Sequence, residues 1–229
     1  MRADAALLAK AIGQSLAVTA VVAAVLFGGA GRFDWLPAWY ISIALTCFFA
    51  IAGTWMLTKA PELLEERLTA SSRAPRWDRV ILASYTTAAF ILLLTAALDA
   101  GRYRWSIVPF AIRIFGIGTV LAAAMLVSWC LMVNPFLSSH VRVQAEREQH
   151  VVSAGPYRYV RHPMYSAVIL LFSALPLALA SWLALVPAAA IAALFAVRTA
   201  LEDRMLASQL AGYRRYAERV RYRLLPGVW

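Results

Sequence analysis

Residues 164–200 read MYSAVILLFSALPLALASWLALVPAAAIAALFAVRTA, and this apolar stretch decides the fold class. A membrane helix needs about 20 apolar residues to cross a hydrocarbon core of about 30 Å, so the stretch is too long for one crossing. Pro176, Ser181 and Pro187 interrupt it. Because such residues break or end helices, we expect a helical hairpin with its tip near residues 180–182.

Four more apolar segments precede this hairpin, at residues 5–27, 35–57, 80–98 and 107–133. The chain is 62% hydrophobic and only 15% charged, whereas soluble domains carry about 25% charged residues. The sequence therefore predicts an all-α, polytopic transmembrane bundle of about five to six spans, in which the last two spans are short. Cys47 and Cys130 lie within predicted spans and are expected to be small buried hydrophobic residues.

The net charge of +10 is distributed unevenly between the two sides of the membrane. If the N-terminus is cytoplasmic, only Arg32, Arg102 and Arg104 lie outside, and Arg113 falls within a span, where we expect it to snorkel outward. The cytoplasmic side then receives Arg2, Lys10, Lys59, Arg67, Arg73, Arg76, Arg79, Arg142, Arg147, Arg158, Arg161 and the arginines of residues 198–223. This asymmetry follows the positive-inside rule and places both termini in the cytoplasm. The basic surplus fits anionic lipid headgroups and requires no nucleic acid.

Two features organise the rest of the chain. In the loop at residues 58–79, the sequence PELLEERL has helical periodicity and predicts a short amphipathic helix at the membrane interface, with a solvated loop as the alternative. After residue 133 the chain becomes polar. We therefore divide it into N-terminal transmembrane helices, residues 1–133, and a C-terminal region, residues 134–229, with a loop, the hairpin and a basic tail.

Polar residues gather in two blocks on either side of the hairpin. The first block holds His140, His150 and His162, and the second is rich in tyrosine and arginine from Tyr213 to Arg223. The hairpin brings both blocks to one membrane face, so we expect a cytosol-facing pocket open to a soluble cofactor and a lipid-soluble substrate. The histidines include no close-spaced pair, which argues against a metal site.

The sequence GPYRYVRHPMY, residues 155–165, is the most distinctive motif. Gly155-Pro156 favours a tight turn, and Pro163 suits the first turn of the next helix. His162, before that proline, is pushed away from helical geometry. The motif thus predicts a loop of fixed shape that lines a pocket, although aromatic and arginine residues also anchor helices at interfaces.

Arg198 and Glu202 lie one helical turn apart, with Asp203 next to them. They fit a stabilising i,i+4 pair. They equally fit a functional pair at the end of a membrane helix, with an anionic position for a cationic ligand. The residues alone leave both interpretations open.

These motifs together resemble the isoprenylcysteine carboxyl methyltransferase family and related phospholipid methyltransferases. The resemblance is carried by Asn134–Ser138, Val141–Gln144, His150–Val152, Gly155–Tyr165, Arg198-x-x-x-Glu202-Asp203, Gly212-Tyr213 and Tyr216, with a weaker echo at residues 61–67 and 77–79. Asp203 and Ala167 stand where the family often has Glu and Gly.

The resemblance implies an S-adenosyl-L-methionine site without a Rossmann domain, and indeed the chain has no G-x-G-x-x-G motif after a strand pattern. The residues that would enclose the cofactor are Gln144, His150, Val151, Val152, Tyr157, His162, Pro163, Met164 and Tyr165. Glu202 would hold its amino-acid end, and Arg198 would meet the substrate, so Arg198 and Glu202 are the expected catalytic residues.

We therefore expect an integral membrane methyltransferase, in a bacterial inner membrane by its alanine- and arginine-rich composition, that acts on a lipid-like or small hydrophobic acceptor. A carboxylate, an amine and a thiol are all compatible acceptors. An NADPH-dependent membrane reductase of the sterol type is the alternative enzyme, because residues 222–227, YRLLPG, are similar to its ending. A non-catalytic protein whose basic tail binds lipid is the third hypothesis.

Overall fold

The computed structural model describes residues 2–69 and 74–229, and all regular elements in these ranges are helical. The elements are α1 (Arg2–Ala30), α2 (Leu36–Lys59), α3 (Pro61–Leu68), α4 (Arg76–Ala96), the π-helix η1 (Ala97–Tyr103), α5 (Phe110–Val133), the 3₁₀ turns η2 (Ala145–Arg147) and η3 (Gly155–Arg158), α6 (Pro163–Ala178), α7 (Leu185–Gln209) and α8 (Tyr213–Arg219). Five helices in this part of the chain are long and apolar enough to cross a membrane, and α6 is a shorter apolar helix. The predicted all-α membrane bundle is confirmed.

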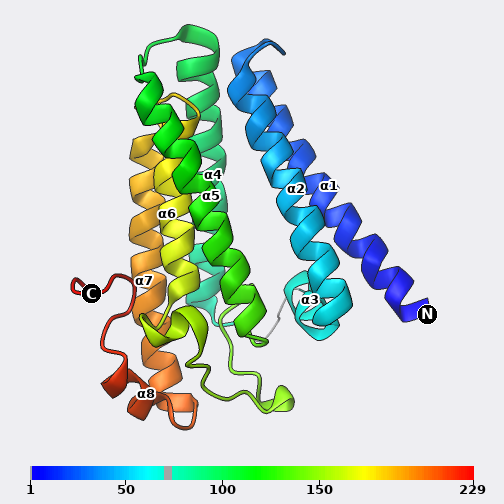
Figure 1. Ribbon diagram of the computed structural model, residues 1–229, viewed down its shortest axis with the longest axis vertical. Helices are drawn as coiled ribbons and strands as arrows, with labels where there is room; N and C mark the ends of the chain where they lie inside the picture. Colours follow the sequence, from blue (N-terminus) through cyan, green and yellow to red (C-terminus); the bar gives the residue numbers. More distant parts are fainter. Residues whose placement is uncertain (1, 70–73) are drawn as a thin grey trace.

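The long helices run alternately up and down, so the connections gather at two ends of the bundle (Figure 1). The N-terminus, α3, α8 and the long segment between α5 and α6 lie at the lower end in Figure 1. The short connections at residues 31–35, 104–109 and 179–184 lie at the other end, with Arg32, Arg102 and Arg104 on or next to them. Arg73, expected on the cytoplasmic side, is outside the described residues.

One hydrophobic core joins the two halves of the chain. Its fully buried members include Leu26 on α1, Leu92 on α4, Leu179 after α6 and Ile191 on α7. This core therefore contains residues from both parts of the chain, 1–133 and 134–229.

The hairpin forms as predicted, between the end of α6 at Ala178 and the start of α7 at Leu185. Ala180 at its tip has a positive φ of 64°. The expectation that both hairpin helices are short is wrong for α7, which has 25 residues, whereas α6 has 16. Helix α7 is longer because its polar end, from Arg198 to Gln209, continues as helix past the apolar segment.

The third apolar segment also extends beyond its predicted end at residue 98. Asp99, the residue after this predicted end, is completely buried within η1. Its carboxylate accepts hydrogen bonds from the Ser106 amide at 2.9 Å, the Ser106 hydroxyl at 2.5 Å and the Ser181 hydroxyl at 2.6 Å. Three donors replace the water that a buried carboxylate loses, so the helix does not have to end there.

The predicted amphipathic helix is present as α3, and its apolar face is covered by protein. Leu63 and Leu64 are buried against Met56 of α2 and Leu131 of α5. The short helix therefore belongs to the bundle, at the end that carries the polar loop.

Close packing of α5 on α6 yields a prediction with a matched control. A Cβ at Gly116 would lie 2.7 Å from the Ala178 nitrogen, while a Cβ at Gly118 would meet nothing within 4 Å. Gly116→Ala should destabilise the protein by about 1–3 kcal/mol through overpacking. Gly118→Ala should be neutral or slightly stabilising because alanine favours helices. Thermal unfolding in detergent checks both, and equal melting temperatures would contradict the helix contact.

Candidate active site

A cavity opens at the end of the bundle where the polar segments meet. Eight of the predicted site residues line it: His150, Val151, Val152, Tyr157, His162, Met164, Tyr165 and Glu202. They come from the loop after α5, from η3, and from the facing ends of α6 and α7. The structure thus brings together sequence blocks that lie on opposite sides of the hairpin.

Three predicted site residues lie behind the cavity wall. Gln144 is 0% exposed; its Nε2 donates to the Phe136 carbonyl at 2.7 Å, and its Oε1 accepts from Arg147 at 2.7 Å. The buried Gln144 side chain therefore stabilises the conformation of the loop through these hydrogen bonds. Pro163 is buried in the first turn of α6, and Arg198 is buried on α7.

The turn at Gly155 positions Tyr157. Gly155 has a φ of 55°, and a Cβ there would lie 2.9 Å from the Val133 side chain and 3.0 Å from Trp129 Nε1. Glycine is thus required both by the left-handed backbone and by the close approach to α5. The turn places the Tyr157 side chain in the cavity wall, where its buried hydroxyl has no hydrogen-bond partner among the described residues. Burial raises the pKa of Tyr157 above its usual range, so the hydroxyl stays protonated.

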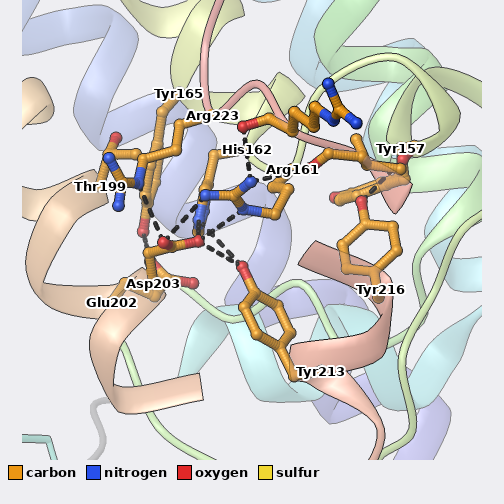
Figure 2. A network of polar contacts seen from close by, with 12 residues as sticks. Tyr157, Arg161, His162, Tyr165, Thr199, Glu202, Asp203, Tyr213, Tyr216 and Arg223 are labelled. Carbon is orange, nitrogen blue, oxygen red and sulfur yellow. Dashed lines mark hydrogen bonds and ion pairs between the residues drawn. The ribbon is translucent and has the colours of Figure 1, made fainter. Parts of the chain in front are cut away.

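Asp203 is the centre of the polar network drawn in Figure 2. Its carboxylate accepts from Arg161 Nε at 2.8 Å and Nη2 at 3.0 Å, from the Tyr213 hydroxyl at 2.8 Å and from Arg223 Nε at 2.9 Å. The His162 Nε2 atom lies 3.3 Å from the same carboxylate. One side chain of α7 thus holds residues from both polar blocks.

Backbone contacts reinforce the network. The amides of Arg161 and His162 donate to the carbonyls of Tyr222 and Arg223, both at 2.9 Å. Arg161 Nη1 also donates to the Val220 and Arg221 carbonyls, at 2.7 and 2.8 Å. Burial alone would lower the pKa of Arg161, but its hydrogen bonds to Asp203 raise it. The C-terminal segment is therefore fixed against the α6 end of the cavity.

Arg198 and Glu202 do not pair with each other in the structure. Arg198 Nε donates to Asp78 Oδ1 at 2.9 Å, and its Nη2 donates to the Ser139 carbonyl at 3.0 Å. Glu202 accepts a hydrogen bond from the Tyr165 hydroxyl. The i,i+4 ion pair suggested by the spacing is therefore wrong, because each residue has a partner on another element. Glu202 faces the cavity as a carboxylate without a cationic partner among the described residues.

Helix α3 fixes the loop that forms one side of the cavity. Glu66 accepts from Arg142 Nε at 3.0 Å and Nη2 at 2.6 Å and from the Ser138 hydroxyl at 2.8 Å. Burial would raise the pKa of Glu66, but these donors outweigh it and lower the pKa. The ionised carboxylate thus ties α3 to the cavity loop.

Several site residues were not identified from the sequence. Asn134, His140, Arg142, Gln149, Tyr213 and Tyr216 also line the cavity. Asp78 and Asp203 position the site through long-range contacts. The motifs contained or adjoined most of these residues, but nothing in the sequence indicated that Asp78 would meet Arg198 across 120 positions.

The membrane-spanning helices define an integral membrane protein. The polar cavity at one end of the bundle is its candidate ligand site. Residues 115–208 match the model of the Isoprenylcysteine carboxyl methyltransferase (ICMT) family. This range covers most of α5, the cavity loop, α6 and nearly all of α7. No curated protein matches the chain. The chain thus carries the ICMT-family region, and it is a membrane methyltransferase that uses S-adenosyl-L-methionine.

The cavity residues fit this cofactor chemically. The cofactor is a cation that carries an amino acid and a nucleoside. Glu202 supplies a carboxylate, Tyr157 an unpartnered buried hydroxyl, and Val151 and Val152 an apolar surface. In the described residues no cluster of His, Cys, Asp or Glu could hold a metal ion.

Asp203 provides a stability prediction. Asp203→Asn should lower the free energy of unfolding by about 3–5 kcal/mol, because Arg161 and Arg223 lose a largely buried anionic partner. Asp34→Asn is the matched control, since Asp34 pairs with Arg32 but its side chain is 78% exposed, and exposed pairs contribute about 0–1 kcal/mol. Denaturation in detergent measures both. A similar loss for the two variants would contradict the role given to the network.

Proposed function

We propose that this protein transfers a methyl group from S-adenosyl-L-methionine, held in the cavity, to a hydrophobic acceptor that partitions into the membrane. The observation that carries the proposal is the single cavity that includes Tyr157, His162 and Glu202, which come from segments on both sides of the hairpin. A site assembled from distant segments is typical of a binding function, whereas interface anchoring alone needs no common cavity.

The cavity residues have distinct roles in this proposal. Glu202, oriented by the Tyr165 hydroxyl, accepts hydrogen bonds from the ammonium group of the cofactor. Tyr157 offers its free hydroxyl, and His150, which lies edge-to-face on Phe136 with ring centres 4.9 Å apart, forms an aromatic wall with Val151 and Val152. His162 and Met164 close the side next to α6. Residues 134–229 thus form the methyltransferase region, on the scaffold of residues 1–133.

S-adenosyl-L-methionine supplies an activated methyl group on a positively charged sulfur. The task of the protein is to hold the acceptor in line with that group at close range and to exclude water. The Asp203 network and the α3 contacts make the cavity wall rigid, which favours such positioning. Arg198 lies behind Tyr165, with its guanidinium carbon 5.1 Å from the ring centre, and orients the acceptor side of the cavity.

The charge distribution supports an orientation with the cavity and both termini in the cytoplasm, and the alanine- and arginine-rich composition favours a bacterial inner membrane. The segments at the polar end of the bundle carry most of the basic residues. The connections at residues 31–35 and 104–109, at the opposite end, carry Arg32, Arg102 and Arg104 on or next to them. Anionic lipid headgroups are then partners of the basic end, and the cofactor reaches the cavity from the cytoplasm.

Glu202→Gln provides the test of the cofactor site. It should weaken binding of S-adenosylhomocysteine at least about tenfold, because a hydrogen bond between charged groups contributes about 1.5–3 kcal/mol. Glu218→Gln is the control, since Glu218 is exposed on α8. Isothermal titration calorimetry on the purified protein measures both affinities.

Two outcomes would contradict the proposal. One is stabilisation by NADPH but not by S-adenosyl-L-methionine in a thermal-shift assay, because a ligand stabilises the state it binds; this would favour the reductase. The other is full function in Glu202→Gln together with loss of function when Arg214 and Arg215 are changed to Glu, as expected of a lipid-binding protein. If neither outcome is observed, incubation of the protein with labelled cofactor and a membrane lipid extract would identify the acceptor.

A further inference from the structure

Asp78 is a buried carboxylate that lies close to the cavity without lining it. It belongs to the first turn of α4, outside residues 115–208, and is 0% exposed. Arg198 Nε donates to its Oδ1 at 2.9 Å, and the Val141 amide donates to its Oδ2 at 3.0 Å. Because Asp78 is not a cavity residue, it can affect a bound cofactor only through a neighbouring side chain.

Two carboxylates are candidates for pairing with Arg198, and one of them lies on the same helix. Glu202 is four residues further along α7, a spacing at which oppositely charged side chains can pair. Both Asp78 and Glu202 interact electrostatically with Arg198. In the structure Arg198 pairs with Asp78, and Glu202 has no cationic partner among the described residues. The contact with Asp78 therefore decides which of the two carboxylates is left free.

Two hydrogen bonds hold the Arg198 guanidinium away from Glu202. Nε is bound by Asp78, and Nη2 donates to the Ser139 carbonyl at 3.0 Å. The Tyr165 ring centre lies 5.1 Å from the guanidinium carbon, while the Tyr165 hydroxyl donates to Glu202. The Nη1 atom of Arg198 has no hydrogen bond among the described residues and is not one of the buried unpartnered atoms. Arg198 thus keeps a donor for an anionic acceptor such as a carboxylate.

From these contacts we infer that Asp78 is a positioning residue for the cofactor site: it binds Arg198 and thereby keeps Glu202 free for the ammonium group of S-adenosyl-L-methionine. The inference rests on the proposed function, in which Glu202 binds that ammonium group. It adds to the site a residue of α4 that does not touch the cofactor. It also gives the ion pair between α4 and α7 a role in binding as well as in packing.

Loss of the Asp78 charge would change the partner of Arg198. Arg198 is 5% exposed, and a buried cation without a counter-charge is unfavourable. Glu202 offers a carboxylate one helical turn away. A pair between Arg198 and Glu202 would have to break before the ammonium group of the cofactor could bind. The apparent affinity then falls by the fraction of protein in which that pair is broken.

Asp78→Asn tests the inference, because it removes the charge and nearly preserves the size of the side chain. Affinity for S-adenosylhomocysteine, which carries the same ammonium group, should fall at least about tenfold, since hydrogen bonds between charged groups favour the paired state by that factor or more. Isothermal titration calorimetry on the purified protein measures the affinity.

The double variant Asp78→Asn/Arg198→Gln identifies the route of the effect. It should recover most of the wild-type affinity, because no arginine then competes for Glu202. Arg198→Gln alone should change the affinity little, although its methyl transfer should fall because Arg198 orients the acceptor. A merely structural role of Asp78 predicts no recovery when Arg198 is also replaced. Asp34→Asn is the control, since Asp34 pairs with Arg32 at the other end of the bundle, and its affinity should match the wild type.

Each other outcome contradicts the inference or the function on which it rests. Unchanged affinity in Asp78→Asn, or equally weak binding in the double variant, would overturn the inference and leave the proposed function intact. Failure of either variant to fold, judged by size-exclusion chromatography in detergent, would also overturn it, because Asp78 would then support the fold and not the choice of partner by Arg198. Absence of S-adenosylhomocysteine binding in the wild type would instead overturn the proposed function.

Discussion

The carboxylate of Asp203 is the contact on which the site depends. It lies at the polar end of α7 and binds Arg161 and Arg223, which are 62 positions apart along the chain but meet on either side of one side chain. Without this anion two guanidinium groups would lie close together in a largely buried environment, which costs free energy. The network therefore determines where the segment before α6 and the C-terminal segment end up, and the cavity lies between them.

Carboxylates from the first half of the chain complete the arrangement. Glu66 on α3 binds Arg142, and Asp78 on α4 binds Arg198. Each acidic residue meets an arginine of the second half at the same end of the bundle. These pairs are directional and at least partly shielded from water, so they select one position for the cavity loop more strongly than apolar packing would. The N-terminal helices thus take part in shaping the site as well as in spanning the membrane.

Hydropathy predicted the spans and the hairpin well, because each helix needs enough apolar length to cross the bilayer. The sequence could not predict the partners of charged residues. Arg198 and Glu202 had ideal helical spacing for a pair, yet Asp78 and Tyr165 are their partners. The third span was predicted to end at residue 98, but the helix continues through Asp99, whose hydrogen bonds come from Ser106 and Ser181. Similarly, the Gln144 side chain turned inward to the Phe136 carbonyl. In all these cases tertiary contacts decided the outcome, and local patterns carry no information about them.

The two ends of the bundle differ in how closely they are packed and in how their polar groups are hydrogen-bonded. At the far end, the Asp99 carboxylate is satisfied by serine donors, and a Cβ on Gly101 would lie 2.6 Å from Ala30. Small residues and the hydrogen bonds of Asp99 thus allow close packing at that end. At the cavity end, polar atoms such as the Tyr157 hydroxyl and His140 Nδ1 remain unpartnered among the described residues. Because unpaired buried groups cost free energy, a ligand that accepts or donates a hydrogen bond at the Tyr157 hydroxyl would remove this cost at the cavity end of the bundle.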